Sequence, residues 1–199
     1  MPAKILMPIG DAAEAIDTLY PLYRVQEEGY ECVVAGPKAR TYHLVMHEIP
    51  PGWDITREGP SYHLAATIAF ADVKPEEYSG LFLTGGRAPE YIRYDQNLMR
   101  IVRHFFAEEK PVAVVCHGAE IVAAADVIRG KRMATVAKCQ MDVEFSGGIY
   151  VNDGCVLEGN MVSGRTWHDQ HRYMREFIRM LREQVAREQD AMKLEAASQ

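Results

Sequence analysis

The sequence lacks the features that would assign it to several common classes of protein. It has no apolar run long enough to span a membrane, and its apolar start, KILMPIG, is too short for the core of a signal peptide. Its lysines and arginines form no basic cluster, and the net charge at pH 7 is −6, which is atypical of proteins that bind nucleic acids. We therefore expect a cytoplasmic protein that binds neither a membrane nor a nucleic acid.

The cysteines also lack a recognisable spacing. Neither a zinc ribbon nor a thioredoxin motif is indicated, because no CxxC pair is present. In a reducing compartment all four should be free thiols. The HLVMH segment lacks the glutamate of a zinc-protease motif, and no glycine-rich nucleotide motif occurs. The sequence thus predicts no metal and no cofactor.

What the chain does contain is an alternation of short apolar runs and longer amphipathic segments. Its 199 residues, 48% hydrophobic and 25% charged, suit a single domain over 1–199. Continuous apolar strands that alternate with helices predict an α/β fold, with a mostly parallel sheet covered on both faces. The expected strands are 4–10, 30–36, 79–86, 111–115, 133–136, 148–159 and 160–164, with a hairpin turn at 152–154.

The expected helices lie between these strands. They are 11–29, 95–109, 118–129 and 167–193. The segment 41–72 is less regular and rich in turn formers and aromatic residues, so we expect an insertion or cover near the site. Parallel sheets of this kind bind ligands beyond the carboxyl ends of their strands.

One such strand end carries a thiol. In PVAVVCHGAE a buried strand ends at Cys116 and a helix follows, which is the pattern of a nucleophile elbow. The helix N-terminus should stabilise a thiolate and lower its pKa. Gly118 would allow the sharp turn. A small buried cysteine at a strand end is the alternative, and it is the more usual role of a free cysteine.

Four segments resemble the DJ-1/PfpI superfamily, in particular its PfpI-like and plant DJ-1-like branches. They are PIGDAAEAID, LFLTGGRAPEYIR, KPVAVVCHGAEIVAAADVIRGKR and EGNMVSGRT…YMREFIRML. Their order and spacing match the family over nearly the whole chain. The resemblance implies a flavodoxin-like α/β sandwich with Cys116 as the catalytic nucleophile.

The resemblance also implies roles for several neighbours of this cysteine. Glu14 would hydrogen-bond the sulfur and handle its proton, although its spacing from Asp11 is also that of a helix cap. Glu90 would reach His117 across a subunit interface and fix its tautomer.

The glycines complete the expected site. Gly85 and Gly86 would permit close backbone approach, and a backbone N–H near Gly86 would form an oxyanion hole with that of His117. Departures from the family pattern at AKCQMDVEFSGGIYV and at His168 alter the expected wall of the pocket.

These features favour a cysteine-dependent, cofactor-independent enzyme acting on small reactive carbonyls. The activity would resemble that of glyoxalase III, which converts methylglyoxal or glyoxal to hydroxy acids, or that of a deglycase. One alternative is an intracellular cysteine peptidase or amidase of the PfpI type. Another, without catalysis, is a cysteine-based sensor of oxidative stress or a chaperone. A homo-oligomer, whether dimer, trimer or hexamer, is expected.

Overall fold

A seven-stranded sheet forms the centre of the molecule. The computed structural model describes residues 2–197, and its strand order is β11-β12-β8-β7-β1-β3-β6. Neighbouring strands are parallel, apart from the antiparallel pair β11 and β12. The strands are β1 (Lys4–Pro8), β3 (Glu31–Gly36), β6 (Ile68–Ala69), β7 (Gly80–Leu83), β8 (Val112–Val115), β11 (Val156–Glu158) and β12 (Met161–Gly164). The predicted α/β fold with a mostly parallel sheet is confirmed.

The side chains of each strand alternate between two apolar cores, one on each face of the sheet. In β8, Val112 and Val114 enter one core, and Ala113 and Val115 enter the other. This follows from the two-residue period of a strand. Both faces are buried, which explains why the strands appear in the sequence as continuous apolar runs.

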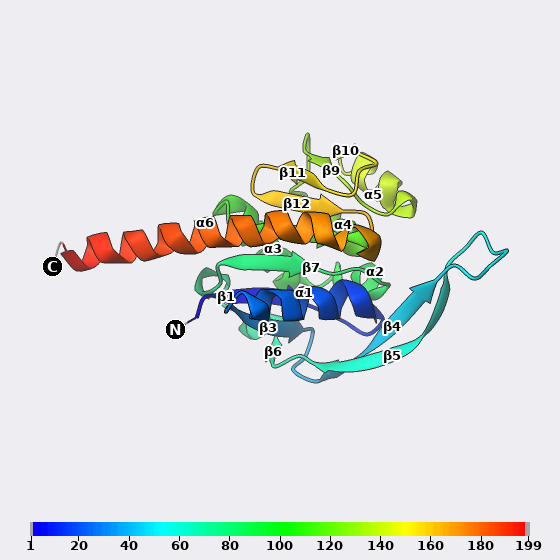
Figure 1. The fold of residues 1–199 in the computed structure, drawn as a ribbon, viewed down its shortest axis with the longest axis horizontal. Helices are drawn as coiled ribbons and strands as arrows, with labels where there is room; N and C mark the ends of the chain where they lie inside the picture. The colour runs from blue at the N-terminus through cyan, green and yellow to red at the C-terminus, as the bar shows by residue number, and fades with distance from the viewer. Residues whose placement is uncertain (1, 198–199) are drawn as a thin grey trace.

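Helices cover both faces (Figure 1). One core takes the apolar side of α3 (Gln96–Ala107), and the other takes that of α6 (Gln170–Ala197). The remaining helices are α1 (Ala15–Glu27), α2 (Ala88–Ile92), α4 (Ala119–Ala124) and α5 (Gln140–Phe145). The sandwich architecture expected from the resemblance is therefore present.

Several boundaries differ from those predicted. The first helix begins at Ala15 rather than 11, because Ala13–Glu14 forms a short strand, β2. Residues 152–154 are not a hairpin turn: β10 (Ile149–Tyr150) pairs in parallel with β9 (Arg132–Met133), whereas β11 pairs with β12. The Asn-Asp-Gly sequence there joins strands of two different sheets.

The segment 41–72 is more regular than its sequence suggests. β4 (Thr41–Glu48) and β5 (Arg57–Ala65) form a long antiparallel hairpin, which we call the hairpin arm, and β2 pairs with β4. Figure 1 shows the arm leaving the body at the end where the parallel strands finish. The arm therefore lies at the edge of the sheet where ligands bind in folds of this kind.

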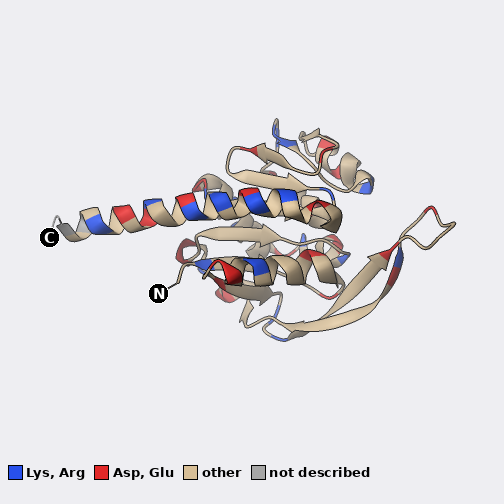
Figure 2. Ribbon diagram, viewed as in Figure 1, with Lys and Arg blue, Asp and Glu red and all other residues tan. Residues whose placement is uncertain are grey.

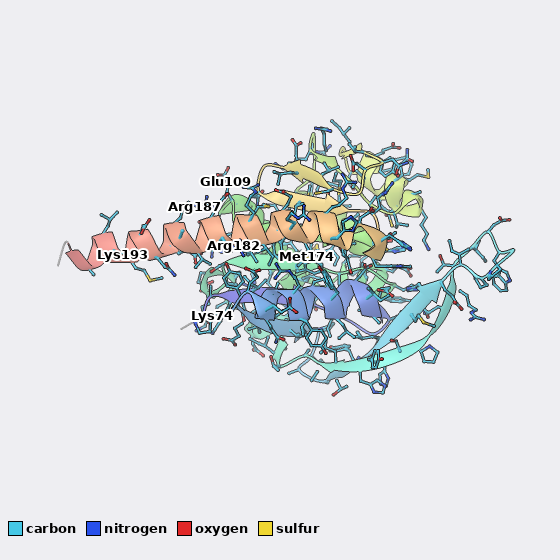
Figure 3. The ribbon with its side chains drawn as sticks, viewed as in Figure 1. Lys74, Glu109, Met174, Arg182, Arg187 and Lys193 are labelled. Carbon is cyan, nitrogen blue, oxygen red and sulfur yellow. The ribbon has the colours of Figure 1, made fainter. Side chains whose placement is uncertain are left out.

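The last helix leaves the body at the opposite end (Figure 1). Met174 is buried against the sheet, whereas the later part of α6, which carries Arg187 and Lys193, extends beyond the body (Figure 3). Charges of both signs alternate along this projecting part (Figure 2). No helix in the described part of the chain is long and apolar enough to cross a membrane.

Candidate active site

The cysteine expected at a strand-to-helix corner lies there. Cys116 follows the last residue of β8 and begins the 3₁₀ turn Cys116–Gly118, which leads directly into α4. Its φ is +53°, a left-handed conformation that is unusual for a residue with a side chain. Such strain persists only where the surrounding structure enforces it, and it is common at active sites.

Glycines around the elbow permit the chain segments to pack closely against Cys116, because a residue with a side chain would not fit there. A Cβ on Gly118 would lie 2.7 Å from the carbonyl oxygen of Leu83. A Cβ on Gly85 would lie 2.6 Å from the Cβ of Cys116 and 3.2 Å from its Sγ. Gly86 has a φ of +83°, and its backbone runs against the chain at Glu14. The end of β7 can therefore approach the elbow closely only with glycine at these positions.

The sulfur of Cys116 is buried and receives two backbone hydrogen bonds. Burial raises the pKa of this thiol well above its usual value, and the negative charge of Asp17 raises it further. Hydrogen bonds from the backbone N–H groups of His117 and Gly86 act in the opposite direction. The expectation that the helix N-terminus lowers the pKa of this thiol is therefore wrong, because the loss of hydration outweighs its effect.

The carboxyl group that faces the sulfur belongs to Asp17. A Cβ on Gly85 would lie 2.5 Å from Oδ2 of Asp17 and also against the side chain of Cys116, so both side chains meet there. Burial raises the pKa of Asp17 well above its usual value, and the charge of Glu14 adds to this, while hydrogen bonding with Cys116 lowers it. Neither carboxylate oxygen has a conventional hydrogen-bond partner among the described residues. The sequence did not indicate Asp17 as a site residue.

Glu14 occupies the cap position rather than the position beside the sulfur. It is the N-cap of α1, and its Oε2 accepts a hydrogen bond of 2.6 Å from the backbone N–H of Asp17. Burial raises its pKa. Because the helix starts at Ala15, the residue that projects toward Cys116 is one turn further along than expected. The charge of Glu14 still acts on Asp17.

His117 lies beside the nucleophile. Its Nδ1 is 3.3 Å from the sulfur of Cys116. Burial, together with the positive charges of Lys138 and His47, lowers the pKa of His117 to about 4. The imidazole is therefore neutral at neutral pH and can accept a proton from a reacting group.

The structure does not bring Glu90 to His117 within one chain. Glu90 is half-buried in the first turn of α2. Its charge acts on Arg87 and Glu120, but not on His117. Contact across a subunit interface remains a prediction.

A cavity of 560 Å³ opens beside the elbow, and Cys116 and His117 form part of its wall. The hairpin arm and the start of the last helical segment form the outer wall. The other lining residues are His47, Glu48, Ile49, Thr56, Val136, Lys138, Thr166, Trp167 and His168. Lys138 also hydrogen-bonds Thr56 on the arm at 3.3 Å. The segment 41–72 thus contributes to the pocket, as a cover near the site would.

A pair of polar side chains, Glu120 and Cys139, lies behind His117. Cys139 is buried, and its sulfur lies 3.8 Å from Oε1 of Glu120. Burial raises the pKa of Glu120 to about 7, and it also raises that of Cys139. The sequence did not indicate this group, because Cys139 is distant in the chain and follows no motif.

With this geometry in place, comparison with known proteins decides the family. The model of the DJ-1/PfpI family matches residues 3–180. This chain belongs to the DJ-1/PfpI family. The resemblance seen in the sequence is therefore confirmed.

Relatives in archaea and plants match most of the chain. "Deglycase TK1284" of Thermococcus kodakarensis is 34% identical over 179 residues, which cover 90% of this chain and 99% of the relative. "Deglycase PfpI" of Pyrococcus furiosus is 32% identical with the same coverage. "Protein DJ-1 homolog D" of Arabidopsis thaliana is 30% identical over 92% of this chain and 49% of its own length.

Solved structures of the same family share the fold. The ThiJ/PfpI domain protein of Brachyspira murdochii superposes with a TM-score of 0.79 at 14% identity and covers 92% of this chain and 99% of its own. Drosophila melanogaster DJ-1beta gives 0.75 at 15% identity, covering 94% and 97%. At these identities the likeness supports the architecture alone.

Proposed function

We propose that this chain is a cysteine-dependent, cofactor-independent enzyme that acts on small reactive carbonyls. The observation that carries the proposal is the environment of one sulfur atom. The thiol of Cys116 receives N–H groups from His117 and Gly86, faces the carboxyl of Asp17, and borders a cavity. A nucleophile, a proton acceptor and donors for a developing oxyanion are therefore in one place.

Activation of the thiol depends on the proton that it shares with Asp17. Both groups resist ionisation because both are buried, so they titrate as a pair. When the pair has lost one proton, the remaining proton can reside on Asp17 and hydrogen-bond the sulfur. The two backbone N–H groups then stabilise the thiolate. The pair thus supplies a nucleophile without full exposure to water.

The reaction would begin with attack of this thiolate on an aldehyde carbon. The carbonyl oxygen takes up a proton, which gives a hemithioacetal. With methylglyoxal, neutral His117 would remove the proton from the former aldehyde carbon, and a proton would return to the neighbouring carbon, which gives a thioester of lactate. Water would then hydrolyse the thioester, releasing lactate and restoring the thiol. The balance is methylglyoxal plus water to lactate, and no cofactor is consumed.

The relatives support carbonyl chemistry more broadly. The two archaeal proteins named above are called deglycases. The same first step on a carbonyl adduct of an amine would release that amine. An enzyme that consumes free methylglyoxal can imitate a deglycase. The two activities are distinguished by measuring amine release in the presence of a large excess of a competing thiol, which traps the free aldehyde. Amine release that keeps its rate under trapping indicates a true deglycase.

The deciding experiment is lactate formation from methylglyoxal by purified wild-type protein and Cys116→Ser. We expect loss of at least ~1000-fold in turnover for this variant, because the nucleophile is removed. Cys32→Ser is the matched control, since Cys32 is half-buried and lies on β3 away from the cavity. It should keep normal turnover. Equal turnover by wild type and Cys116→Ser would overturn the proposal.

Two other functions are discriminated by different measurements. A peptidase would use Cys116 with His117, and Glu90 would have to come from a second subunit, so amide cleavage should disappear on dilution to monomers. A redox sensor would show oxidation of Cys116 well before the other thiols in mass spectrometry after mild peroxide treatment. The contact between Nδ1 of His117 and the sulfur is compatible with either function.

A further inference from the structure

Behind the elbow, three side chains of different chemistry converge. His117 and Glu120 lie three residues apart on one helical turn and so share a face. Cys139 reaches the same place from the 3₁₀ turn Ala137–Cys139. One ligand atom from each residue, a nitrogen, an oxygen and a sulfur, lies within 4.8 Å of the other two. The mechanism proposed above gives no role to Glu120 or Cys139.

The carboxylate of Glu120 points to a missing partner. Its side chain is only 8% exposed, and Oε2 is buried with no hydrogen-bond partner among the described residues. Arg93 forms an ion pair with this oxygen at 3.5 Å, but its guanidinium donates its hydrogen bond to Asp142, at 3.2 Å. A buried polar atom left in this state costs free energy unless a ligand satisfies it.

We propose that His117, Glu120 and Cys139 bind a divalent metal ion of the Zn²⁺ type. Imidazole, carboxylate and thiolate are the three ligand classes that Zn²⁺ uses in proteins. Bonds of about 2.0–2.3 Å place tetrahedral ligand atoms about 3.3–3.8 Å apart. The observed spread requires only small side-chain movements. Oxygen-preferring ions such as Mg²⁺ would not select a thiol and an imidazole.

Charge balance favours this class of ion. Binding would release the proton of the Cys139 thiol to solvent, so the metal would be held by one thiolate and one carboxylate, with His117 neutral. The two negative ligands cancel the charge of the ion in a largely buried place. Arg93 also pairs with Asp142, so it keeps a carboxylate partner when Glu120 binds the metal.

The fourth coordination position would face the cavity, since His117 is part of the cavity wall and Glu120 and Cys139 lie behind it. A water molecule or a ligand from the pocket could therefore complete the coordination. The bound metal would also hold His117, which the carbonyl mechanism uses as a base. We thus expect the metal-loaded form to be less active toward carbonyls than the metal-free form.

The test uses Co²⁺ as a spectroscopic probe with the full-length protein, first stripped with a chelator and kept reduced. Titration of wild type should give the intense visible bands of tetrahedral Co²⁺ and a thiolate-to-metal charge-transfer band that saturate at one equivalent, and Zn²⁺ should displace both. This readout does not require any enzymatic activity, so it stands even if the carbonyl chemistry fails.

Variants identify the ligands. Cys139→Ser should abolish the charge-transfer band, and Glu120→Gln should weaken Co²⁺ binding by ~10-fold or more, in line with the loss of one ligand. Cys116→Ser and Cys32→Ser are the matched controls and should keep the band. Thermal melting checks that each variant is folded. Absence of the band in wild type, its survival in Cys139→Ser, or its loss in Cys116→Ser would each overturn the proposed ligand set.

Discussion

The two ends of the molecule differ in how well their polar groups are satisfied. Among the described residues, six buried side-chain polar atoms lack a hydrogen-bond partner, and five of them lie around the elbow. They belong to Glu14, Asp17, Glu120 and Tyr173. Burial raises the pKa of the Tyr173 hydroxyl, and the nearby charges of Asp17 and Cys116 raise it further. On the projecting part of α6 the charged side chains instead pair in solvent, as Lys193 does with Asp190 at 3.0 Å.

This contrast indicates where the protein tolerates unfavourable local structure. The elbow combines a cysteine whose backbone is in the left-handed conformation, buried carboxyl groups, and glycines beside which there is no space for a side chain. Each feature reduces stability, and such features persist together mainly where function requires them. The surface of α6 follows the ordinary rules of an exposed helix. Substitutions at the two ends should therefore have very different effects.

The largest effect on stability is expected at Gly85. In Gly85→Ala the new methyl group would lie 2.5 Å from Oδ2 of Asp17 and 2.6 Å from Cβ of Cys116. We expect a loss of about 1–3 kcal/mol in stability from this overpacking, and at least ~100-fold lower turnover because the sulfur is displaced. Gly59→Ala on the arm, where the nearest atom is 3.8 Å away, should change neither chemical denaturation nor turnover.

Asp17→Asn should slow alkylation of Cys116 by iodoacetamide at neutral pH by ~10-fold or more. The amide cannot hold the thiol's proton, and we expect this loss to outweigh the removal of a negative charge that raises the pKa of Cys116, while burial still opposes the thiolate. Rates measured by mass spectrometry, with Cys32 as the internal reference, test this. An unchanged rate at Cys116 would show that Asp17 is not the proton partner.

The same variant should change how stability depends on pH. Because burial raises the pKa of Asp17, above its ordinary value of 3.8 the folded protein keeps a proton that the unfolded chain has released. Stability therefore falls as pH rises from there toward the raised folded-state value. Asp17→Asn removes this contribution, so its stability relative to wild type should increase with pH in urea denaturation. A difference that stays constant with pH would contradict the raised pKa.

Two substitutions of Glu14 distinguish its role as a helix cap from a role in handling the proton of Cys116. Glu14→Ala should cost about 1 kcal/mol from the lost cap, whereas Glu14→Gln keeps an acceptor for the N–H of Asp17 and should retain most of that stability. Neither should slow alkylation of Cys116 as strongly as Asp17→Asn does. A drop in alkylation by Glu14→Gln equal to that of Asp17→Asn would restore the proton-handling role first expected for Glu14.

The smallest effect is expected on α6. Arg179→Ala removes ion pairs with Glu176 and Glu183, but all three side chains are substantially exposed. Exposed pairs are screened by water and salt, so stability should change by no more than ~0.5 kcal/mol, and turnover should not change. A larger loss in urea denaturation would mean that this helix surface contributes more than its exposure suggests.

The sequence was most informative about features that a short stretch of residues determines by itself. Continuous apolar runs predicted the strands, because both faces of the sheet are buried. The elbow followed from Cys116-His117-Gly118 at the end of such a run. In contrast, Asp17 could not be identified, because the residue that faces the sulfur depends on where α1 begins. That start is fixed by the pairing of β2 with β4, which is a contact between distant segments.

The hairpin arm was missed for a related reason. Only the start of β4 alternates, where Tyr42 and Leu44 are buried between exposed neighbours, and β5 has no buried residue, so a clear two-residue pattern covers only a small part of 41–65. The convergence of His117, Glu120 and Cys139 likewise depends on the packing of the 3₁₀ turn at 137–139 against α4. Such juxtapositions arise from tertiary contacts, and a single sequence does not record them.

The direction in which α6 leaves the body has a practical consequence. The helix spans 28 residues, or about 42 Å at 1.5 Å per residue; its first part packs on the sheet, and its later part extends away from the end that carries the arm (Figure 1). It therefore provides a built-in spacer: coupling the protein to a bead, a sensor chip or a fusion partner through this tail would orient every molecule with its cavity outward.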